Sequence, residues 1–379
     1  MNSYPVEGIP PSSYFSRAVY LDPHFVIAAP EMPFTASLAK ILCEWDFNEV
    51  FSDGEPRDNY VPNDVYISQG SSIGDRSTIG DLDKLQQAER FYARFQRYTE
   101  SLFDKAERDE GLSLNSIAEN IKNACDFVRE YHRYLMRAQR HIEPVRDEDY
   151  LVSHTVRSTI ITIIIGIYLK LPTHRLIELG TAALLHDIGM IKLPEESYLN
   201  SKSLSEHEKK QIYAHPVLAY NILKAHDFPL TVSVAVLEHH ERENGTGYPQ
   251  QLRGEKISLY AKIIGVACSY EAISAKRLHR EARSGHSGML ELLKNEGKKY
   301  DDTIVRALVY SLSIYPIGLY VMLSSGRKGQ VVDVNPENPR FPIVQVFGEL
   351  MPDGKNRIMQ TAPDGLSIVR PLNREEIED

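Results

Sequence analysis

Cysteine is scarce in this chain, and its scarcity limits the kind of protein the chain can be. Only three of the 379 residues are cysteines, namely Cys43, Cys125 and Cys268. None belongs to a CxxC pair, so the sequence indicates neither a disulfide framework nor a zinc ribbon. A reduced, cytoplasmic compartment is therefore expected.

Long apolar runs and an excess of basic charge are also missing. The N-terminus has no basic start followed by an apolar run, so no signal peptide is expected. The most apolar stretch, 160–169, is about half of what a membrane-spanning helix needs, which predicts a buried core helix and no membrane partner. A net charge of −9 argues against a DNA or RNA partner, although a small anion could still bind a locally basic pocket.

The hydrophobic pattern predicts a mainly α chain with two small additions. Short strand-like runs around Asp22-Pro23 and a helix over 34–45 indicate a small α+β module, followed by a polar linker, within 1–80. Residues 81–146 have helical spacing broken at Gly111 and are interpreted as a helical spacer packed on its neighbours, rather than as a signalling or dimerisation pair. A run of helices over 147–314 is predicted next, and strand-like segments predict a small β appendage over 315–379.

Histidine and carboxylate residues occupy unusual places in the helical region 147–314. His154 falls on a stripe of apolar positions, and His186-Asp187 ends an apolar helix. His215 precedes Pro216, which we expect to end the helix there, and His239-His240 ends another helix. Neighbouring helical residues project about 100° apart, so the paired histidines are expected to serve two adjacent ions.

Each of these residues alone is more often a hydrogen-bonded core residue than a ligand. Five imidazoles and one carboxylate at helix ends and buried positions within one domain favour a transition-metal site instead. Two such metals would activate a bridging hydroxide and stabilise phosphoryl oxygens.

Two further segments have an ordinary interpretation and a functional one. In the loop over 244–249, which ends in Gly247-Tyr248-Pro249, two glycines allow close backbone approach and the tyrosine offers a ring and a hydroxyl, but a tight loop is an equally good interpretation. The basic cluster over 276–280 would suit phosphate, although a solvated helix end is favoured on sequence alone.

Taken together, His154, His186-Asp187, His215-Pro216 and the HHERENGTGYP segment of 239–249 resemble the HD-GYP family of HD phosphohydrolases. The resemblance covers roughly 147–280 and implies an all-helical HD-type domain that binds two divalent ions, iron or manganese, and hydrolyses cyclic di-GMP to the linear dinucleotide or GMP. The metal ligands that it implies are His154, His186, Asp187, His215, His239 and His240, with Asp187 bridging the ions. The substrate contacts that it implies are Gly247, Tyr248, Pro249, Arg277 and Arg280. The N-terminal module also resembles segments found ahead of such domains.

The sequence departs from the family pattern at three positions. Met190 stands where the family has a phosphate-contacting lysine, for which Lys192 is the expected catalytic substitute. Cys268 replaces a metal-binding aspartate and is either a thiolate ligand or an inert buried residue. Tyr150 replaces the glutamate of three-metal members, so at most two metals are expected.

These departures leave two main hypotheses open. The chain is either a cyclic di-GMP phosphodiesterase, or a catalytically weakened receptor or protein-interaction module. An HD phosphohydrolase acting on another nucleotide is a third, less favoured reading. A homodimer or a signalling-protein partner is compatible with each of them.

Overall fold

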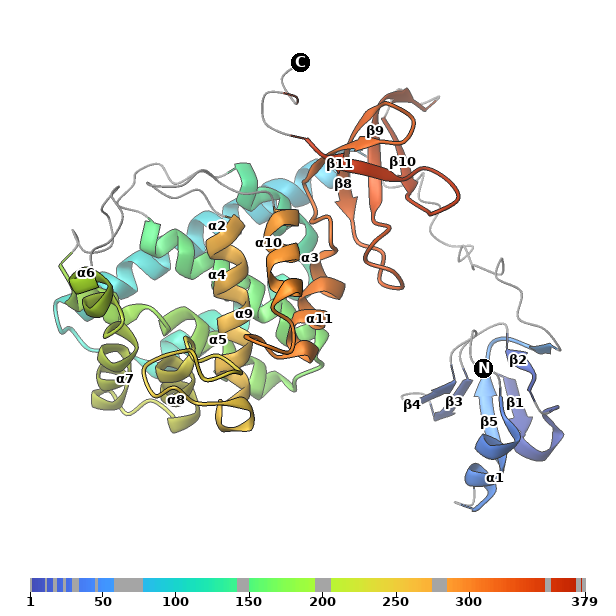
Figure 1. Ribbon diagram of the computed structural model, residues 1–379, viewed down its shortest axis with the longest axis horizontal. Coiled ribbons are helices and arrows are strands. Elements are labelled where there is room, and N and C mark those ends of the chain that lie inside the picture. The colour runs from blue at the N-terminus through green and yellow to red at the C-terminus, as the bar shows by residue number, and fades with distance from the viewer. Residues whose placement is uncertain are drawn as a thin grey trace. The chain divides into compact units, whose positions relative to one another are not determined.

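The computed structural model describes residues 2–10, 12–15, 19–22, 25–28, 34–44, 47–57, 78–141, 150–194, 206–274, 285–351, 356–372 and 376. The chain divides into two compact units, Met1–Asp75 and Arg76–Asp379. The predicted mainly helical fold, with a small N-terminal α+β module and a C-terminal β appendage, is confirmed (Figure 1). The finer division at residues 80, 146 and 314 stays a prediction.

The N-terminal unit is a small antiparallel sheet with one helix. Its four-stranded sheet has the order β1-β5-β3-β4, and β2 pairs with β6 separately. The bounds are β1 Asn2–Pro5, η1 Val6–Gly8, β2 Tyr14–Phe15, β3 Val19–Asp22, β4 Phe25–Ala28, α1 Ala36–Glu44, β5 Glu49–Ser52 and β6 Pro56–Arg57. The predicted strands on both sides of Asp22-Pro23 are present, and the edge strand β1 was not predicted. Most of the predicted linker lies outside the described residues.

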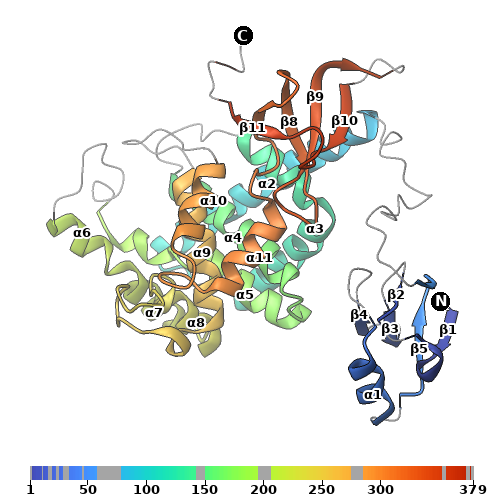
Figure 2. The ribbon, with the colours of Figure 1, turned by 45° about the vertical axis from the view of Figure 1, so that its right-hand side comes forward.

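The second unit begins as a helical bundle. Its elements are α2 Thr78–Glu107, α3 Leu114–His141, α4 Tyr150–Tyr168, α5 Thr173–Leu185, η3 Ile188–Lys192, α6 Glu206–Ile212, α7 His215–Ala225, α8 Leu230–Glu238, η5 Gly254–Lys256, α9 Leu259–Ser274, α10 Gly285–Lys294 and α11 Asp302–Leu312. The helices α2 to α11 share one hydrophobic core. Figure 2 shows the same bundle from a second direction.

Helix α4 is the central helix of this bundle. It contacts α2, α3, α5, α9 and α11, and 14 of its 19 residues are buried. By length and composition it could cross a membrane, but its hydrophobic surface is covered by these neighbouring helices. The expected core helix is therefore present, although it is longer than the apolar run 160–169 suggested.

The long helices α2 and α3 pack on the bundle as well as on each other. Phe91 of α2 stacks on Phe127 of α3 at a ring distance of 4.2 Å, and Phe127 stacks on Tyr131 at 4.5 Å. Both helices also contact α4. The two helices therefore pack on the rest of the bundle, and the interpretation of 81–146 as a helical spacer stays a prediction.

The C-terminal part is a five-stranded antiparallel sheet of order β10-β9-β8-β7-β11. The strands are β7 Tyr320–Leu323, β8 Lys328–Asp333, β9 Ile343–Leu350, β10 Asn356–Gln360 and β11 Ile368–Pro371. The first three were predicted and the last two were not. An ion pair of 2.8 Å between Arg133 and Asp333 joins this sheet to α3.

Candidate metal centre

The structure brings all seven residues predicted to bind metal into two adjacent groups. The first group contains His154 of α4, His186 after α5 and Cys268 of α9; the second contains Asp187, His215, His239 and His240. Within each group the possible ligand atoms lie within 4.8 Å of one another. Six of the seven residues are buried, and His240 is half-buried, so the second group is the more open of the two.

The carboxylate of Asp187 lies between the two groups. One oxygen, Oδ2, lies 3.3 Å from Nε2 of His186 and 3.6 Å from Nε2 of His154. The other oxygen, Oδ1, lies 3.2 Å from Nε2 of His215 and 3.7 Å from Nε2 of His239. This arrangement suits a carboxylate that bridges two ions, with one oxygen directed at each.

Three of the histidines are oriented by backbone carbonyls at helix ends. The Nδ1 atoms of His186, His215 and His239 lie 2.7, 2.6 and 2.6 Å from the carbonyl oxygen of the residue three positions earlier. These carbonyls belong to the last turns of α5, α6 and α8, where they have no partner within their helix. Since a carbonyl only accepts, each Nδ1 donates, and each Nε2 is directed at Asp187.

His154 is oriented by a side chain instead. Its Nδ1 contacts the carboxylate of Glu271, which is buried one turn after Cys268 on α9. Glu271 also lies 3.7 Å from Arg157, which donates to the Tyr92 hydroxyl at 3.2 Å. Glu271 was not predicted as a site residue; its spacing of three residues from Cys268 was the available signal.

Two local expectations were wrong. Helix α6 ends at Ile212, and His215-Pro216 opens α7, because proline needs no N–H partner in the first turn of a helix. His239 and His240 fall in the same group, with ring centroids 4.1 Å apart. The expected 100° divergence does not apply, since α8 ends at Glu238 and His240 lies beyond the helix.

A glycine allows the element after Asp187 to approach α7. A Cβ on Gly189 would lie 2.1 Å from the His215 carbonyl oxygen and 2.6 Å from the Ala219 nitrogen. Both neighbours are backbone atoms, so only glycine permits this distance. The close contact of η3 with α7 places His215 beside Asp187.

The loop over 247–249 is held against the second group by a buried carboxylate. Glu241 accepts hydrogen bonds from the backbone of Gln250 at 2.6 Å and of Leu252 at 2.9 Å. A Cβ on Gly247 would lie 2.5 Å from backbone atoms of 240–242. The ring of Tyr248 consequently stacks on His240 at 4.6 Å.

Comparison with known proteins finds similar sequences over the region that holds this site. A family model described as an HD domain matches residues 141–304. The cyclic di-GMP phosphodiesterase PdeB of Borreliella burgdorferi is 28% identical over 239 residues, 62% of this chain and 63% of that protein. The cyclic di-GMP phosphodiesterase PA4108 of Pseudomonas aeruginosa is 32% identical over 201 residues, 53% of this chain and 48% of that protein. Residues 141–304 thus match an HD domain, and the relatives that are similar over this region are named cyclic di-GMP phosphodiesterases.

Both matches cover less than two thirds of the relatives' own lengths, namely 63% and 48%. Among solved structures, the HDG"Y"P protein Bd1817 of Bdellovibrio bacteriovorus aligns with a TM-score of 0.49 and 17% identity, over 81% of this chain and 97% of that one.

The histidines near Asp187 whose pKa is shifted fall into two sets, one with raised and one with lowered values. Burial alone would lower the pKa of His154, but Glu271, Cys268 and Asp187 raise it to about 9. The pKa of His186 is also raised, because Asp187 and Cys268 outweigh its burial. Burial opposes the Cys268 thiolate, yet His186 and His154 lower its pKa to about 6.

In the second group, the two consecutive histidines are instead held in the neutral form. Burial lowers the pKa of His239 to about 4, although Asp187 acts in the opposite direction. Burial and the neighbouring His239 and His215 hold the pKa of His240 well below its usual range. Burial alone would raise the pKa of Asp187, but His186, His215 and His239 keep it well below the ordinary value.

The structure shows where the residues that depart from the HD-GYP pattern lie. Met190 is buried in η3. Lys192 lies 3.1 Å from the exposed carboxylate of Asp109, and its catalytic role stays a prediction. The Cys268 sulfur lies 3.3 Å from Nε2 of His186, which favours the ligand interpretation over an inert thiol. The predicted substrate contacts Arg277 and Arg280 lie outside the described residues.

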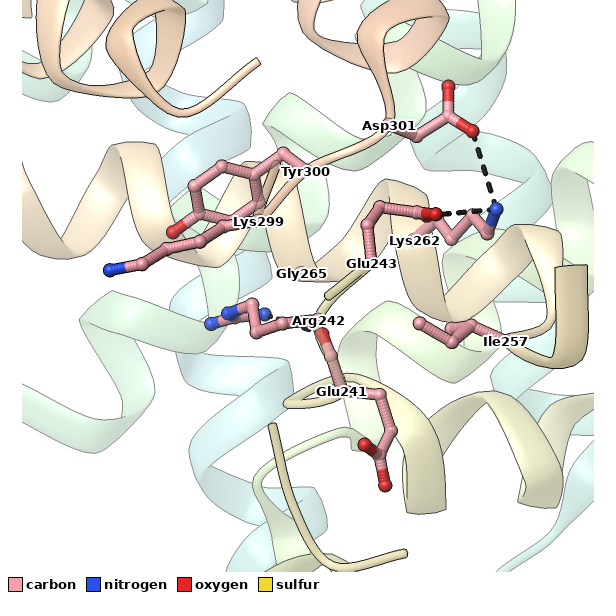
Figure 3. Close-up of a pocket in the computed structure, with 9 residues that line it drawn as sticks. All are labelled: Glu241, Arg242, Glu243, Ile257, Lys262, Gly265, Lys299, Tyr300 and Asp301. Carbon is pink, nitrogen blue, oxygen red and sulfur yellow. Dashed lines mark hydrogen bonds and ion pairs between the residues drawn. The ribbon is translucent and has the colours of Figure 1, made fainter. Parts of the chain in front are cut away.

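A small pocket adjoins the segment that follows the paired histidines (Figure 3). Lys262 bonds to Glu243 at 2.9 Å and to Asp301 at 3.3 Å, and the guanidinium of Arg242 covers the Tyr300 ring at 5.1 Å. None of the seven metal-ligand candidates lines this pocket. Its paired charges hold the 241–243 segment in place beside α9.

Proposed function

We propose that the chain is a metal-dependent phosphodiesterase that hydrolyses cyclic di-GMP to the linear dinucleotide or to GMP. The observation that supports this most directly is the carboxylate of Asp187, with one oxygen facing each of two ligand groups. Relatives over the same region are named cyclic di-GMP phosphodiesterases. The resemblance of the 239–249 segment to the HD-GYP motif supports a cyclic dinucleotide as the substrate.

The donor set fits two divalent transition-metal ions. Imidazole, carboxylate and thiolate together suit iron or manganese, with the thiolate adding softness to the first group. Ions held by these residues would neutralise charge on the phosphoryl oxygens and lower the pKa of a water that they bind. The ring of Tyr150 stacks on His154 where three-metal members have a glutamate, which supports two ions rather than three.

The chain's own residues then orient the substrate. The backbone of the Gly247-Tyr248-Pro249 loop borders the more open second group, so one phosphodiester would lie beside His240. Among the described residues the hydroxyl of Tyr248 has no hydrogen-bond partner, and burial raises its pKa, so it stays protonated and able to donate at neutral pH. Arg277, Arg280 and Lys192 are retained as proposed phosphate contacts.

The test is product formation by metal-loaded protein. Purified protein is loaded with manganese or anaerobically with iron, its metal content is measured, and cyclic di-GMP is followed by chromatography. Linear dinucleotide or GMP should appear, and Asp187→Asn should abolish it. Asp126→Asn, at an exposed carboxylate of α3, should behave like the unaltered protein. Two bound ions per chain without turnover would refute the enzyme.

A non-catalytic receptor is the second candidate, favoured by Met190 and Cys268. Buried methionine cannot supply the ammonium that the family pattern has at this position. Calorimetry on the same preparation separates the two functions, because a receptor binds cyclic di-GMP without consuming it. A cytoplasmic location and a homodimer or signalling-protein partner stay predictions.

A further inference from the structure

The tyrosine of the Gly-Tyr-Pro loop has both ring faces covered. Tyr248 stacks on His240 at 4.6 Å and on Tyr213 at 4.2 Å, each at an interplanar angle of 23°. His240 and Tyr213 make no ring contact with each other among the described aromatic pairs. Two rings stacked on one face would touch, so they lie on opposite faces of Tyr248. A nucleobase therefore cannot stack on Tyr248.

Among the described aromatic pairs, Tyr213 is the outer end of this column. It lies between α6 and α7, two residues before the metal-ligand candidate His215, and 48% of it is exposed. Its inner face rests on Tyr248, so its ring plane is fixed by a partner that Glu241 and the backbone of 240–242 hold in place. A ring that is both exposed and oriented is the arrangement that stacking on a base requires.

We propose that Tyr213 is the stacking surface for one purine base of a bound cyclic dinucleotide. This inference rests on the proposed function and identifies a substrate contact that the motif residues do not supply. Only one ring, that of Tyr248, separates Tyr213 from His240. A base attached to a phosphodiester beside His240 can therefore reach Tyr213.

Removing the ring should weaken binding by a factor characteristic of base stacking. Loss of one base–aromatic stack lowers affinity about 5- to 150-fold. Tyr213→Phe keeps the ring and should leave KM for cyclic di-GMP nearly unchanged. Tyr213→Leu keeps apolar bulk without a π face and should raise KM by that factor, with a smaller change in kcat. A hydroxyl role would make the phenylalanine variant as weak as the leucine variant and would refute the proposal.

A purely structural role for Tyr213 predicts different readouts. If Tyr213 only supported Tyr248, the Tyr213→Leu variant would bind less metal or bind inorganic phosphate, which carries no base, more weakly. The stacking role leaves both unchanged. Tyr168→Leu is the matched control, because Tyr168 is 46% exposed and stacks on Tyr310 at 6.1 Å, with no described contact to the metal groups.

A fluorescent reporter tests the contact directly. The chain has one tryptophan, so Trp45→Phe provides a silent background in which Tyr213→Trp is the only indole. Cyclic di-GMP should quench this fluorescence and inorganic phosphate should not, while Tyr168→Trp should respond to neither. Nucleotide binding without quenching, and without a KM effect in Tyr213→Leu, would overturn this inference and leave the phosphodiesterase intact. Failure to bind cyclic di-GMP at all would overturn both.

Discussion

Metal loading should release protons from one ligand group and few from the other. The raised pKa values of His154 and His186 keep both imidazoles protonated at pH 7.5 in metal-free protein, while Cys268 is already mostly thiolate at its pKa of about 6. An ion bound by this first group must displace both protons. In the second group, His239 and His240 are already neutral at this pH.

The pH dependence follows from this count. A raised pKa means that the proton competes with the metal until the pH exceeds that pKa, about 9 for His154. Because two protons are released, the metal affinity of the first group should rise about 100-fold per pH unit, or ~2.7 kcal/mol. This slope applies to the pH range in which both imidazoles are protonated and Cys268 is a thiolate. His239 and His240 add almost no slope above their lowered pKa values. Acidification should therefore empty the first group before the second.

Calorimetry in two buffers of different ionisation enthalpy counts these protons. Manganese titrated into metal-free protein at pH 7.5 should give a binding step with little proton release and a step that releases about two protons. The control is Glu271→Gln, which keeps every proposed ligand but removes the carboxylate that most strongly raises the pKa of His154. In this variant the number of protons released by that step should fall towards one. Equal proton release in both steps, or an unchanged count in the variant, would refute the reasoning.

Three substitutions test other parts of the site. Cys268→Asp should shift metal preference in the first group from softer ions towards manganese, as measured by metal analysis after loading with mixed ions; unchanged composition would mean that the thiol is not a ligand. Gly189→Ala would place a methyl group 2.1 Å from the carbonyl oxygen of His215, so it should cost about 3 kcal/mol in unfolding free energy and lower metal content, whereas Gly365→Ala, with room around it, should change neither. Glu241→Gln should cost about 1–3 kcal/mol, because a charged acceptor of two backbone hydrogen bonds is lost, and should raise KM more than it lowers metal content; a loss of metal without a KM change would contradict the loop-holding role.

The site residues could be predicted because the metal centre interrupts a regular hydrophobic pattern. His154 lies on a mostly apolar stripe, and Cys268 follows apolar positions at helical spacing on α9, where it is buried. In both places helical periodicity assigns a face to each side chain, and a polar residue on the buried face needs a partner. The same reasoning predicted the helical core, since α4 is buried along most of its length.

The grouping of the ligands could not be predicted in this way, because it depends on where helices end. His240 lies two residues past the end of α8, and His215 opens α7 instead of closing α6. A shift of one or two residues at a helix end rotates a side chain by 100° or more. Glu271 and Tyr213 were not predicted for another reason. The role of Glu271 comes from a contact with a helix distant in sequence and that of Tyr213 from its exposure, and neither produces a periodic pattern in the sequence.

The histidine ligands also differ in what maintains their orientation. His186, His215 and His239 rely on carbonyls that every helix end provides, so their orientation depends on helix termination and not on the identity of a partner side chain. His154 relies on Glu271, whose charge also raises the pKa of the imidazole. The ligand that this carboxylate orients is therefore also the one it helps to keep protonated. The first group also contains Cys268, so substitution of its side chains and a change of pH should both alter the binding of one and the same ion. The orientation of His215 and His239 in the second group should persist as long as α6 and α8 end where they do.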